Sequence, residues 1–161
     1  LVEPLLTSPE RISMLRCLVS SSACIDNEVK KKLFEALPCE FHEMYGASEI
    51  ATATDLNRDQ AISKPESLGT VCPNVEIRIV DKKLVDCKPM EVGQIIVKSP
   101  LASAGYYQLP KITEESFVDG YFHTGDLGYL DEESYLYFVD REKDVIISGG
   151  MNTTCGGFAS P

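Results

Sequence analysis

The sequence predicts an incomplete α/β layer followed by an antiparallel, barrel-like β subdomain. In the first third of the chain, apolar strand segments alternate with an amphipathic helix, which is the element order of an α/β layer. Further on, short segments with alternating apolar residues follow one another at hairpin spacing, which is typical of antiparallel sheet. We therefore expect an α/β subdomain over residues 1–60, a β subdomain over 61–140 and a separate final segment over 141–161.

The chain opens with three predicted elements. Ser8 and Pro9 predict a short helix over 9–14, because serine caps helices and proline suits their first turn. The apolar run 15–19 predicts a buried strand. The small residues over 20–24 then predict a loop.

A helix and a second strand complete the expected α/β layer. Asp26 or Asn27 can cap a helix over 28–37, whose apolar residues share one face. Its basic run, 30–32, is expected to be a solvated surface. Residues 40–44 predict the second strand.

The remaining expectations concern the β subdomain. Residues 52–67 are polar and predict a loop. Thr113 is the expected cap of a helical turn within 111–117. The segments expected to be strands are 75–80, 94–98, 121–123, 127–131 and 135–139.

The composition limits the classes of function. A formal net charge of −10 without a basic stripe disfavours nucleic-acid binding, which needs clustered Lys and Arg. No apolar run is long enough for a transmembrane helix, and no signal peptide is visible at the start of the sequence. The six cysteines form no C-x-x-C pair, so a zinc ribbon is disfavoured and a reducing compartment is favoured. We expect a cytoplasmic protein.

Two segments of the α/β part could carry chemistry. The loop over 20–24 would let a flat ring approach the backbone, although a plain strand-to-helix turn is the alternative. The segment Tyr45 to Glu49 offers an aromatic face, a glycine, a hydroxyl and a carboxylate. The hydroxyl can contact a phosphate and the carboxylate can hold Mg²⁺, which prefers oxygen ligands. Taken alone, a turn is the simpler interpretation of this segment.

Two further segments lie in the second half of the chain. His123 to Asp126 places a carboxylate after a glycine, where it can accept hydrogen bonds from vicinal ribose hydroxyls. A hairpin turn with a capping aspartate is the alternative. The charged run 141–144 would ordinarily be a solvated surface. It gains interest because the glycine pair 149–150 and Asn152 follow it after one apolar strand.

In this order, the motifs resemble the adenylate-forming superfamily, in its acyl-CoA synthetase (acid–CoA ligase) branch. The resemblance is carried by Tyr45-Gly46-Ala47-Ser48-Glu49, Thr124-Gly125-Asp126 and Asp140 to Asn152, and more loosely by Leu15-Arg16 with Ser20 to Cys24. Members of this family activate a carboxylic acid with ATP to an acyl-adenylate, and then transfer the acyl group to coenzyme A. The resemblance therefore implies ATP, Mg²⁺ and coenzyme A as cofactors or co-substrates, and a carboxylic acid as substrate.

The resemblance also implies roles for individual residues. Tyr45 would stack on adenine, Ser48 would contact phosphate, and Glu49 would ligate Mg²⁺. Asp126 and Arg141 would hold the ribose hydroxyls. The other implied positions are Ser22, Ala23, Cys24 and Gly46 for the nucleotide, Gly46 and Ala47 for the acyl group, Lys143 for the hinge, and Ser148, Gly149 and Gly150 for the loop of the thioester step.

The family pattern is incomplete in this chain. The family usually has Gly-Gly-Ala-Pro where this chain has Ser21 to Cys24, and residues 153–161 do not match. The upstream phosphate loop and the C-terminal domain with its catalytic lysine are both absent. Residues 1–152 therefore correspond to the end of the large N-terminal domain and the hinge. We expect a fragment of an ATP-dependent acid–CoA ligase that is inactive alone.

Two other functions stay open from the sequence. A truncated, non-catalytic isoform would act as a binding or regulatory module that associates with a full-length homologue. A Mg²⁺-dependent phosphohydrolase would use Glu49, Asp126 and Asp144, although nothing supplies its nucleophile. The sequence does not define the carboxylic acid, so fatty, aryl and dicarboxylic acids are all compatible with it.

Overall fold

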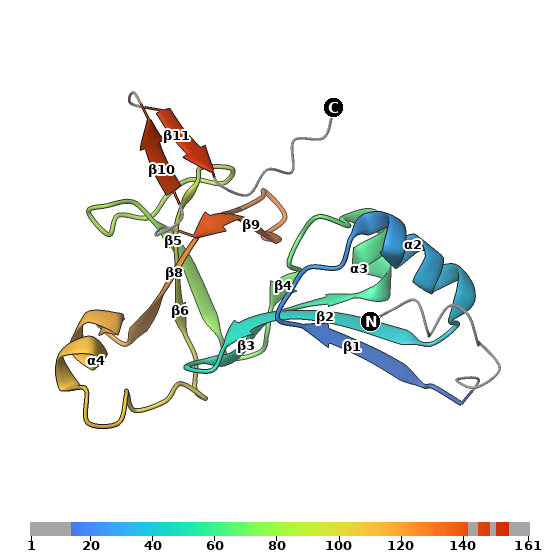
Figure 1. Cartoon of the computed structure of the whole chain (residues 1–161), viewed down its shortest axis with the longest axis horizontal. Coiled ribbons are helices and arrows are strands. Elements are labelled where there is room, and N and C mark those ends of the chain that lie inside the picture. Colours follow the sequence, from blue (N-terminus) through green and yellow to red (C-terminus); the bar gives the residue numbers. More distant parts are fainter. Residues whose placement is uncertain (1–13, 142–144, 149–150, 155–161) are drawn as a thin grey trace.

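The computed structural model describes residues 14–141, 145–148 and 151–154. In it a four-stranded mixed sheet carries helices on one face, and a five-stranded antiparallel sheet lies beside it (Figure 1). The hairpin of β10 (Val145–Ser148) and β11 (Met151–Thr154) follows the second sheet. This arrangement confirms the predicted fold class, an incomplete α/β layer followed by a barrel-like antiparallel sheet. The predicted helix over 9–14 lies outside the described residues, except for Met14.

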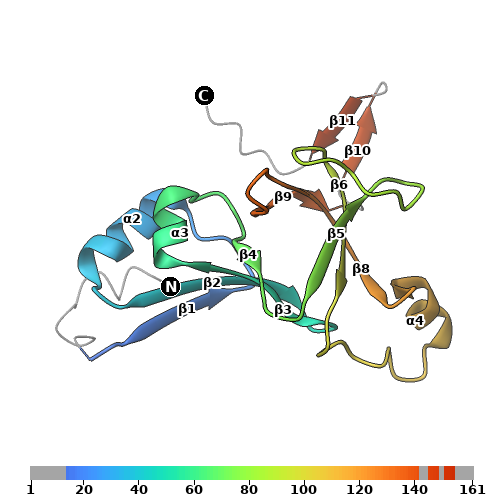
Figure 2. The ribbon, with the colours of Figure 1, turned by 180° about the vertical axis from the view of Figure 1, so that it is seen from behind.

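The four-stranded sheet has the order β1-β2-β3-β4. Its strands are β1 (Cys17–Ser21), β2 (Glu40–Ala47), β3 (Ala51–Asn57) and β4 (Thr70–Val71). β1 and β2 run parallel, as a strand-helix-strand unit requires, whereas β3 returns antiparallel to β2. The helices α2 (Asn27–Ala36) and α3 (Arg58–Ser63) lie on the same face of this sheet (Figure 2).

The helix α2 confirms the predicted helix over 28–37. The Asp26 carboxylate accepts hydrogen bonds from the backbone N–H groups of Glu28 (2.9 Å) and Val29 (3.2 Å), and so caps the helix. The apolar face packs on β2, where the rings of Phe34 and Phe41 meet edge-on with centroids 5.0 Å apart. The local cap and the apolar face together define this element.

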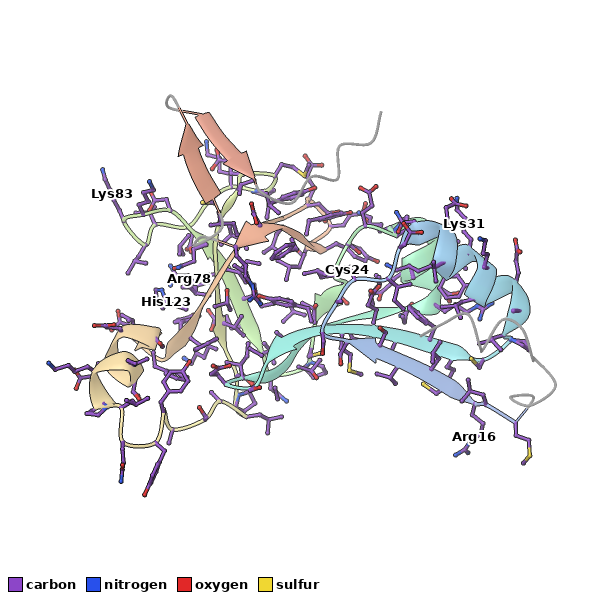
Figure 3. The ribbon with its side chains drawn as sticks, in the orientation of Figure 1. Arg16, Cys24, Lys31, Arg78, Lys83 and His123 are labelled. Carbon is purple, nitrogen blue, oxygen red and sulfur yellow. The ribbon has the colours of Figure 1, made fainter. Side chains whose placement is uncertain are left out.

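The expectation that residues 30–32 form a solvated face is wrong at Lys30. Its side chain is 4% exposed and points toward the sheet, with Nζ 2.6 Å from Oε2 of Glu43 on β2. The same Nζ donates a hydrogen bond to the carbonyl of Pro65 (2.7 Å). Lys31, one residue on, stays exposed on the outer side of α2 (Figure 3). Helical geometry places Lys30 one turn from the buried Leu33, on the face that meets the sheet.

The prediction of a loop over residues 52–67 is wrong, because β3 and α3 occupy most of this segment. The strand was hidden because alanine and threonine alternate in it, and neither residue type is strongly apolar. Ala53 and Leu56 are nevertheless fully buried. A reciprocal capping box starts α3, with Asn57 and Gln60 each accepting the other's backbone N–H at 3.0 Å. The Asn-x-x-Gln spacing was the signal in the sequence.

The antiparallel sheet has the order β5-β6-β8-β7, with β9 also paired to β8. Its strands are β5 (Glu76–Val80), β6 (Gly93–Lys98), β7 (Phe117–Val118), β8 (Tyr121–Leu130) and β9 (Leu136–Arg141). The prediction of two separate strands at 121–123 and 127–131 is wrong, because β8 runs through the intervening motif. Gly125 makes this possible, since its φ of +73° suits glycine far better than other residues.

The helical turn at 111–117 is present as α4 (Pro110–Ser116), but Thr113 is not its cap. Leu109 occupies the cap position without a side-chain hydrogen bond. Thr113 lies one turn inside the helix, where its hydroxyl donates to the carbonyl of Leu109 (3.0 Å) and accepts the N–H of Tyr106 (2.9 Å). Proline at the first helical position explains the earlier start.

One hydrophobic core joins the two larger sheets. Its buried members are Ile50, Ala53, Leu68, Ile79, Ile95, Val97, Phe122 and Leu136. Backbone hydrogen bonds cross the same junction, from Leu68 N to Leu136 O (2.7 Å) and from Leu136 N to Gly69 O (3.0 Å). The division of the chain at residues 60 and 140 stays a prediction. No helix among the described residues is long and apolar enough to cross a membrane.

Candidate functional site

A cavity of about 220 Å³ lies where the loop after β1, the strand β2, the middle of β8 and the strand β9 come together. Figure 3 shows Cys24, from the loop, on the side of the first sheet that faces β9. The residues that line the cavity are Ser22, Ala23, Cys24, Glu43, Met44, Tyr45, Gly46, Leu68, Asp126, Phe138 and Arg141. Residues from all four predicted segments therefore meet in one place.

The Asp126 carboxylate is the charged centre of this cavity. The Asp126 side chain is 10% exposed, and its carboxylate is held from two sides. The Tyr45 hydroxyl donates to Oδ2 (2.8 Å), and Arg141 Nε donates to Oδ1 (3.1 Å). Asp126 and Arg141 are also register partners across β8 and β9, so the backbone fixes their approach. Each carboxylate oxygen keeps a free lone pair and can accept a further hydrogen bond.

The residues just before Asp126 set its position. The Thr124 hydroxyl accepts the Asp126 N–H (3.0 Å) and donates to the carbonyl of Ile95 (2.7 Å) on β6. The left-handed Gly125 lies between them. The motif Thr124-Gly125-Asp126 thus anchors the carboxylate to the neighbouring strand, a role for Thr124 that the sequence did not reveal.

The electrostatics of the cavity keep Tyr45 as a hydrogen-bond donor. Burial raises the pKa of Tyr45 above its ordinary value, and the charge and hydrogen bond of Asp126 raise that pKa further. The phenol is therefore neutral at physiological pH. The pKa of the Cys24 thiol is also raised, first by its partial burial and then by the Glu43 carboxylate.

Glu43 holds the loop that closes the cavity. Its Oε1 accepts the backbone N–H of Ile25 (2.7 Å), while its Oε2 lies beside Lys30 Nζ. The loop turns at Ser22, whose φ of +77° is unusual for a residue other than glycine. The sequence does not predict the roles of Glu43 and Lys30, because the charge pattern of β2 and α2 carries no local sign of their pairing.

The predicted acyl positions, Gly46 and Ala47, have structural roles of their own. Gly46 lies at an irregularity between β2 and β3, where an added Cβ would come 2.0 Å from the carbonyl oxygen of Ala51. Ala47 packs against the core that joins the sheets. Of the two, only Gly46 lines the cavity.

Ser48 and Glu49 lie in the turn after β2 and do not line the cavity. The Glu49 carboxylate accepts the hydroxyl hydrogen of Tyr106 (2.7 Å). Among the described residues, Glu49 belongs to no cluster of three or more metal-ligating side chains. Mg²⁺ in nucleotide sites is held by one or two carboxylates together with phosphate oxygens, so a lone carboxylate fits that donor set.

The other predicted positions lie at the C-terminal end. Lys143, Asp144, Gly149 and Gly150 fall outside the described residues. The backbone of Ser148 pairs with Met151 in the β10–β11 hairpin. The phosphohydrolase alternative needs Glu49 and Asp126 in one site, but the cavity includes Asp126 without Glu49.

The two sheets are those of an adenylate-forming protein, and the chain belongs to the AMP-binding enzyme family, which matches residues 2–107. The long-chain-fatty-acid–CoA ligase of Bacillus subtilis is 37% identical over 142 residues, which are 88% of this chain and 25% of that protein. The 2-succinylbenzoate–CoA ligase of Bacillus cereus is 37% identical over 144 residues, 87% of this chain and 29% of that protein. This chain thus spans roughly a quarter of the length of these relatives.

Solved structures of the family superpose on most of the chain. Unliganded O-succinylbenzoate coenzyme A synthetase from Bacillus subtilis matches with a TM-score of 0.84 and 31% identity, over 94% of this chain and 34% of that chain. The same enzyme in complex with ATP and a magnesium ion matches with a TM-score of 0.81 and 29% identity, over 96% of this chain and 37% of that chain. The amide bond synthetase McbA from Marinactinospora thermotolerans matches with a TM-score of 0.82 and 28% identity, over 89% of this chain and 29% of that chain.

Proposed function

We propose that this chain forms the adenosine-binding wall of an ATP-dependent acid–CoA ligase. The observation that carries the proposal is the buried Asp126 carboxylate, held by Tyr45 and Arg141 at the edge of a cavity closed by residues 22–24. A carboxylate held in this way suits the two vicinal hydroxyls of a ribose. Relatives that are acid–CoA ligases, one of them solved with ATP and magnesium, support the same assignment.

In this proposal the nucleotide binds in an extended arrangement across the cavity. The ring of Tyr45 stacks on adenine while its hydroxyl stays on Asp126, so one side chain links the base to the ribose site. The loop Ser22 to Cys24 lies along the edge of the base. The phosphates extend toward Ser48 and Glu49, and Glu49 would hold Mg²⁺, which neutralises phosphate charge.

The proposed reaction has two steps. The acid's carboxylate oxygen attacks the α-phosphorus of ATP, which releases pyrophosphate and leaves an acyl-adenylate. The thiol of coenzyme A then takes the acyl group, and AMP leaves. Gly46 and Ala47 are proposed to border the acyl group. Lys143 is the proposed hinge, and Ser148, Gly149 and Gly150 form the proposed loop of the second step.

We also propose that the chain binds nucleotide without catalysing adenylation by itself. Among the described residues that line the cavity, Arg141 is the cation, and no lysine is present to stabilise the charge that develops on the phosphoryl group. ATP–pyrophosphate exchange tests this part. We expect no exchange by the purified chain with ATP, Mg²⁺ and a panel of fatty and aryl acids, and measurable exchange would disprove it.

Nucleotide binding is tested separately with AMP, 2′-deoxy-AMP and 3′-deoxy-AMP, titrated into the full chain by NMR. We expect Asp126→Asn to weaken AMP binding about 10–100-fold, because the variant loses a hydrogen bond to a charged group. The same variant should show no preference for AMP over the deoxy nucleotides. The matched control is Asp86→Asn, because Asp86 also accepts from an arginine Nε (Arg78, 2.7 Å) but lies away from the cavity. Equal affinity of the wild type for all three nucleotides would overturn the ribose assignment.

A further inference from the structure

The first sheet carries a cluster of metal-ligating side chains on the face opposite its helices. Leu18 and Phe41 pack with Phe34 of α2, so strand alternation places Cys17, Glu40 and His42 on the other face. One ligand atom from each, a thiol sulfur, a carboxylate oxygen and a ring nitrogen, lies within 4.8 Å of the others. Because Cys17 and Glu40 are register partners in the β1–β2 pair, the backbone itself holds two of the three together.

The imidazole of His42 is already oriented by a fourth residue. Its Nδ1 lies 3.0 Å and 2.8 Å from the two carboxylate oxygens of Asp55 on β3. This contact leaves Nε2 as the ring nitrogen for a metal ion. A carboxylate that fixes the ring of a ligating histidine is the usual outer partner in zinc sites. Both side chains are about one-third exposed, at 30% and 32%, so an ion from solution can reach them.

We propose that Cys17, Glu40 and His42 form a binding site for a zinc-like divalent cation, with Asp55 positioning His42. A sulfur, nitrogen and oxygen set selects Zn²⁺ or Co²⁺ over Mg²⁺ and Ca²⁺, which take oxygen ligands. Donor atoms around a tetrahedral zinc ion lie about 3.3–3.8 Å apart, so small side-chain rotations complete the site. Three protein ligands leave the fourth position to water.

This cation site is separate from the nucleotide cavity. Along β2, Glu43 and Tyr45 face the cavity side of the sheet, and His42 alternates with them onto the open side. Cation binding and AMP binding therefore do not compete for a side chain. The cation-site proposal therefore stands if the nucleotide proposal fails, and the nucleotide proposal stands if the cation-site proposal fails.

Titration of the purified full chain with Co²⁺ tests the proposal, because a cysteine ligand gives a thiolate-to-cobalt charge-transfer absorption. We expect one equivalent of Co²⁺ to produce this band and an excess of Zn²⁺ to remove it. Cys17→Ser should abolish the band and weaken binding by at least about 100-fold, a larger loss than an outer-shell change causes. Cys72→Ser is the matched control, since Cys72 lines the same groove as Cys17 and His42 but lies outside the cluster.

A second variant separates the cation site from a folding defect. Asp55→Asn should keep the charge-transfer band and weaken Co²⁺ binding about 10–100-fold, because only the orientation of His42 changes. Circular dichroism and urea unfolding confirm that each variant stays folded. A band that persists in Cys17→Ser, a band lost in Cys72→Ser, or no band in the wild type would each overturn the proposal.

Discussion

Lys30 Nζ lies 2.6 Å from Glu43 Oε2, and the two side chains are only 4% and 5% exposed. Since the other Glu43 oxygen accepts the N–H of Ile25, this buried ion pair ties α2, β2 and the loop of the cavity together. A buried pair contributes little over an apolar pair of similar shape, but removal of one charge leaves the other unpaired in the interior. The cavity loop therefore depends on a contact in which loss of either charge is costly.

We predict that Glu43→Gln lowers the free energy of unfolding by about 3–5 kcal/mol, because it strands the Lys30 charge. The double variant Lys30→Met/Glu43→Gln should recover most of this loss. Urea unfolding measures both. Lys31→Met, at the neighbouring residue, is the control. Because the Lys31 charge is exposed, its removal should leave the unfolding midpoint unchanged. Equal midpoints for Glu43→Gln and Lys31→Met would contradict the prediction.

The second prediction concerns stability at alkaline pH. Burial, and then the charge and hydrogen bond of Asp126, raise the pKa of Tyr45 above the ordinary value of about 10. Above about pH 10 the unfolded chain releases the phenol proton of Tyr45, whereas the folded chain keeps it. The stability that this proton contributes is therefore complete below about pH 10 and is lost as the pH rises through the pKa of Tyr45 in the folded chain.

We expect the free energy of unfolding of the wild type to fall by up to about 1.4 kcal/mol per pH unit above about pH 10, relative to Tyr45→Phe. Guanidinium unfolding at stepped pH gives the two slopes. The phenylalanine variant removes the titrating group and keeps the ring, so identical slopes would argue against a buried neutral phenol.

The third prediction concerns the stability of the chain at acidic pH. Burial raises the pKa of Asp131, but the hydrogen bond from Lys64 and the N–H groups of Tyr135 and Glu133 outweigh it, so that the pKa is lowered overall. Its contribution is present above the ordinary carboxyl pKa of about 4 and is lost as the pH falls through the folded pKa. Asp131→Asn should therefore destabilise the chain at neutral pH, and its deficit should shrink in acid. Thermal unfolding of the wild type and the variant, at neutral pH and below about pH 4, measures how the deficit changes. A deficit that stays constant over this range would count against the prediction.

The fourth prediction compares two glycines. Gly46→Ala should lower the free energy of unfolding by about 1–3 kcal/mol, because a Cβ there collides with the Ala51 carbonyl. Gly125 has no neighbour within 4 Å of an added Cβ, so Gly125→Ala costs only the left-handed backbone, about 1–2 kcal/mol. Gly125→Asn should restore part of that loss, since asparagine tolerates this conformation. A Gly125→Asn variant no more stable than Gly125→Ala would refute the conformational explanation.

The local parts of this fold could be predicted from the sequence. The helix α2 carries its own cap at Asp26, the strand β5 shows alternating apolar residues, and the strand β6 contains a short continuous apolar run. The strand β3 could not be recognised in the same way. Its buried positions are filled by small residues such as Ala53, whose burial depends on the second sheet rather than on any strong apolar pattern.

The candidate site was predictable as a set of motifs but not as a geometry. Asp126 and Arg141 could be named because the order of motifs matched a family. The hydrogen bond from Tyr45 to Asp126 joins residues 81 positions apart, and the pairing of Lys30 with Glu43 depends on how α2 packs on β2. No local pattern encodes either contact, because both exist only once the two sheets and the helix have assembled.

The core shared by the two larger sheets also governs how the described part of the chain loses its structure. Ala53 comes from the first sheet and Ile50 from the turn between its strands β2 and β3, whereas Ile95 and Leu136 come from the second sheet, yet all four exclude water from the same interior. Neither sheet can open without wetting the other's apolar face, so the two should melt in one cooperative transition. Amide protons on both sides of the junction, such as those of Leu68 and Leu136, should exchange with solvent only through that global opening.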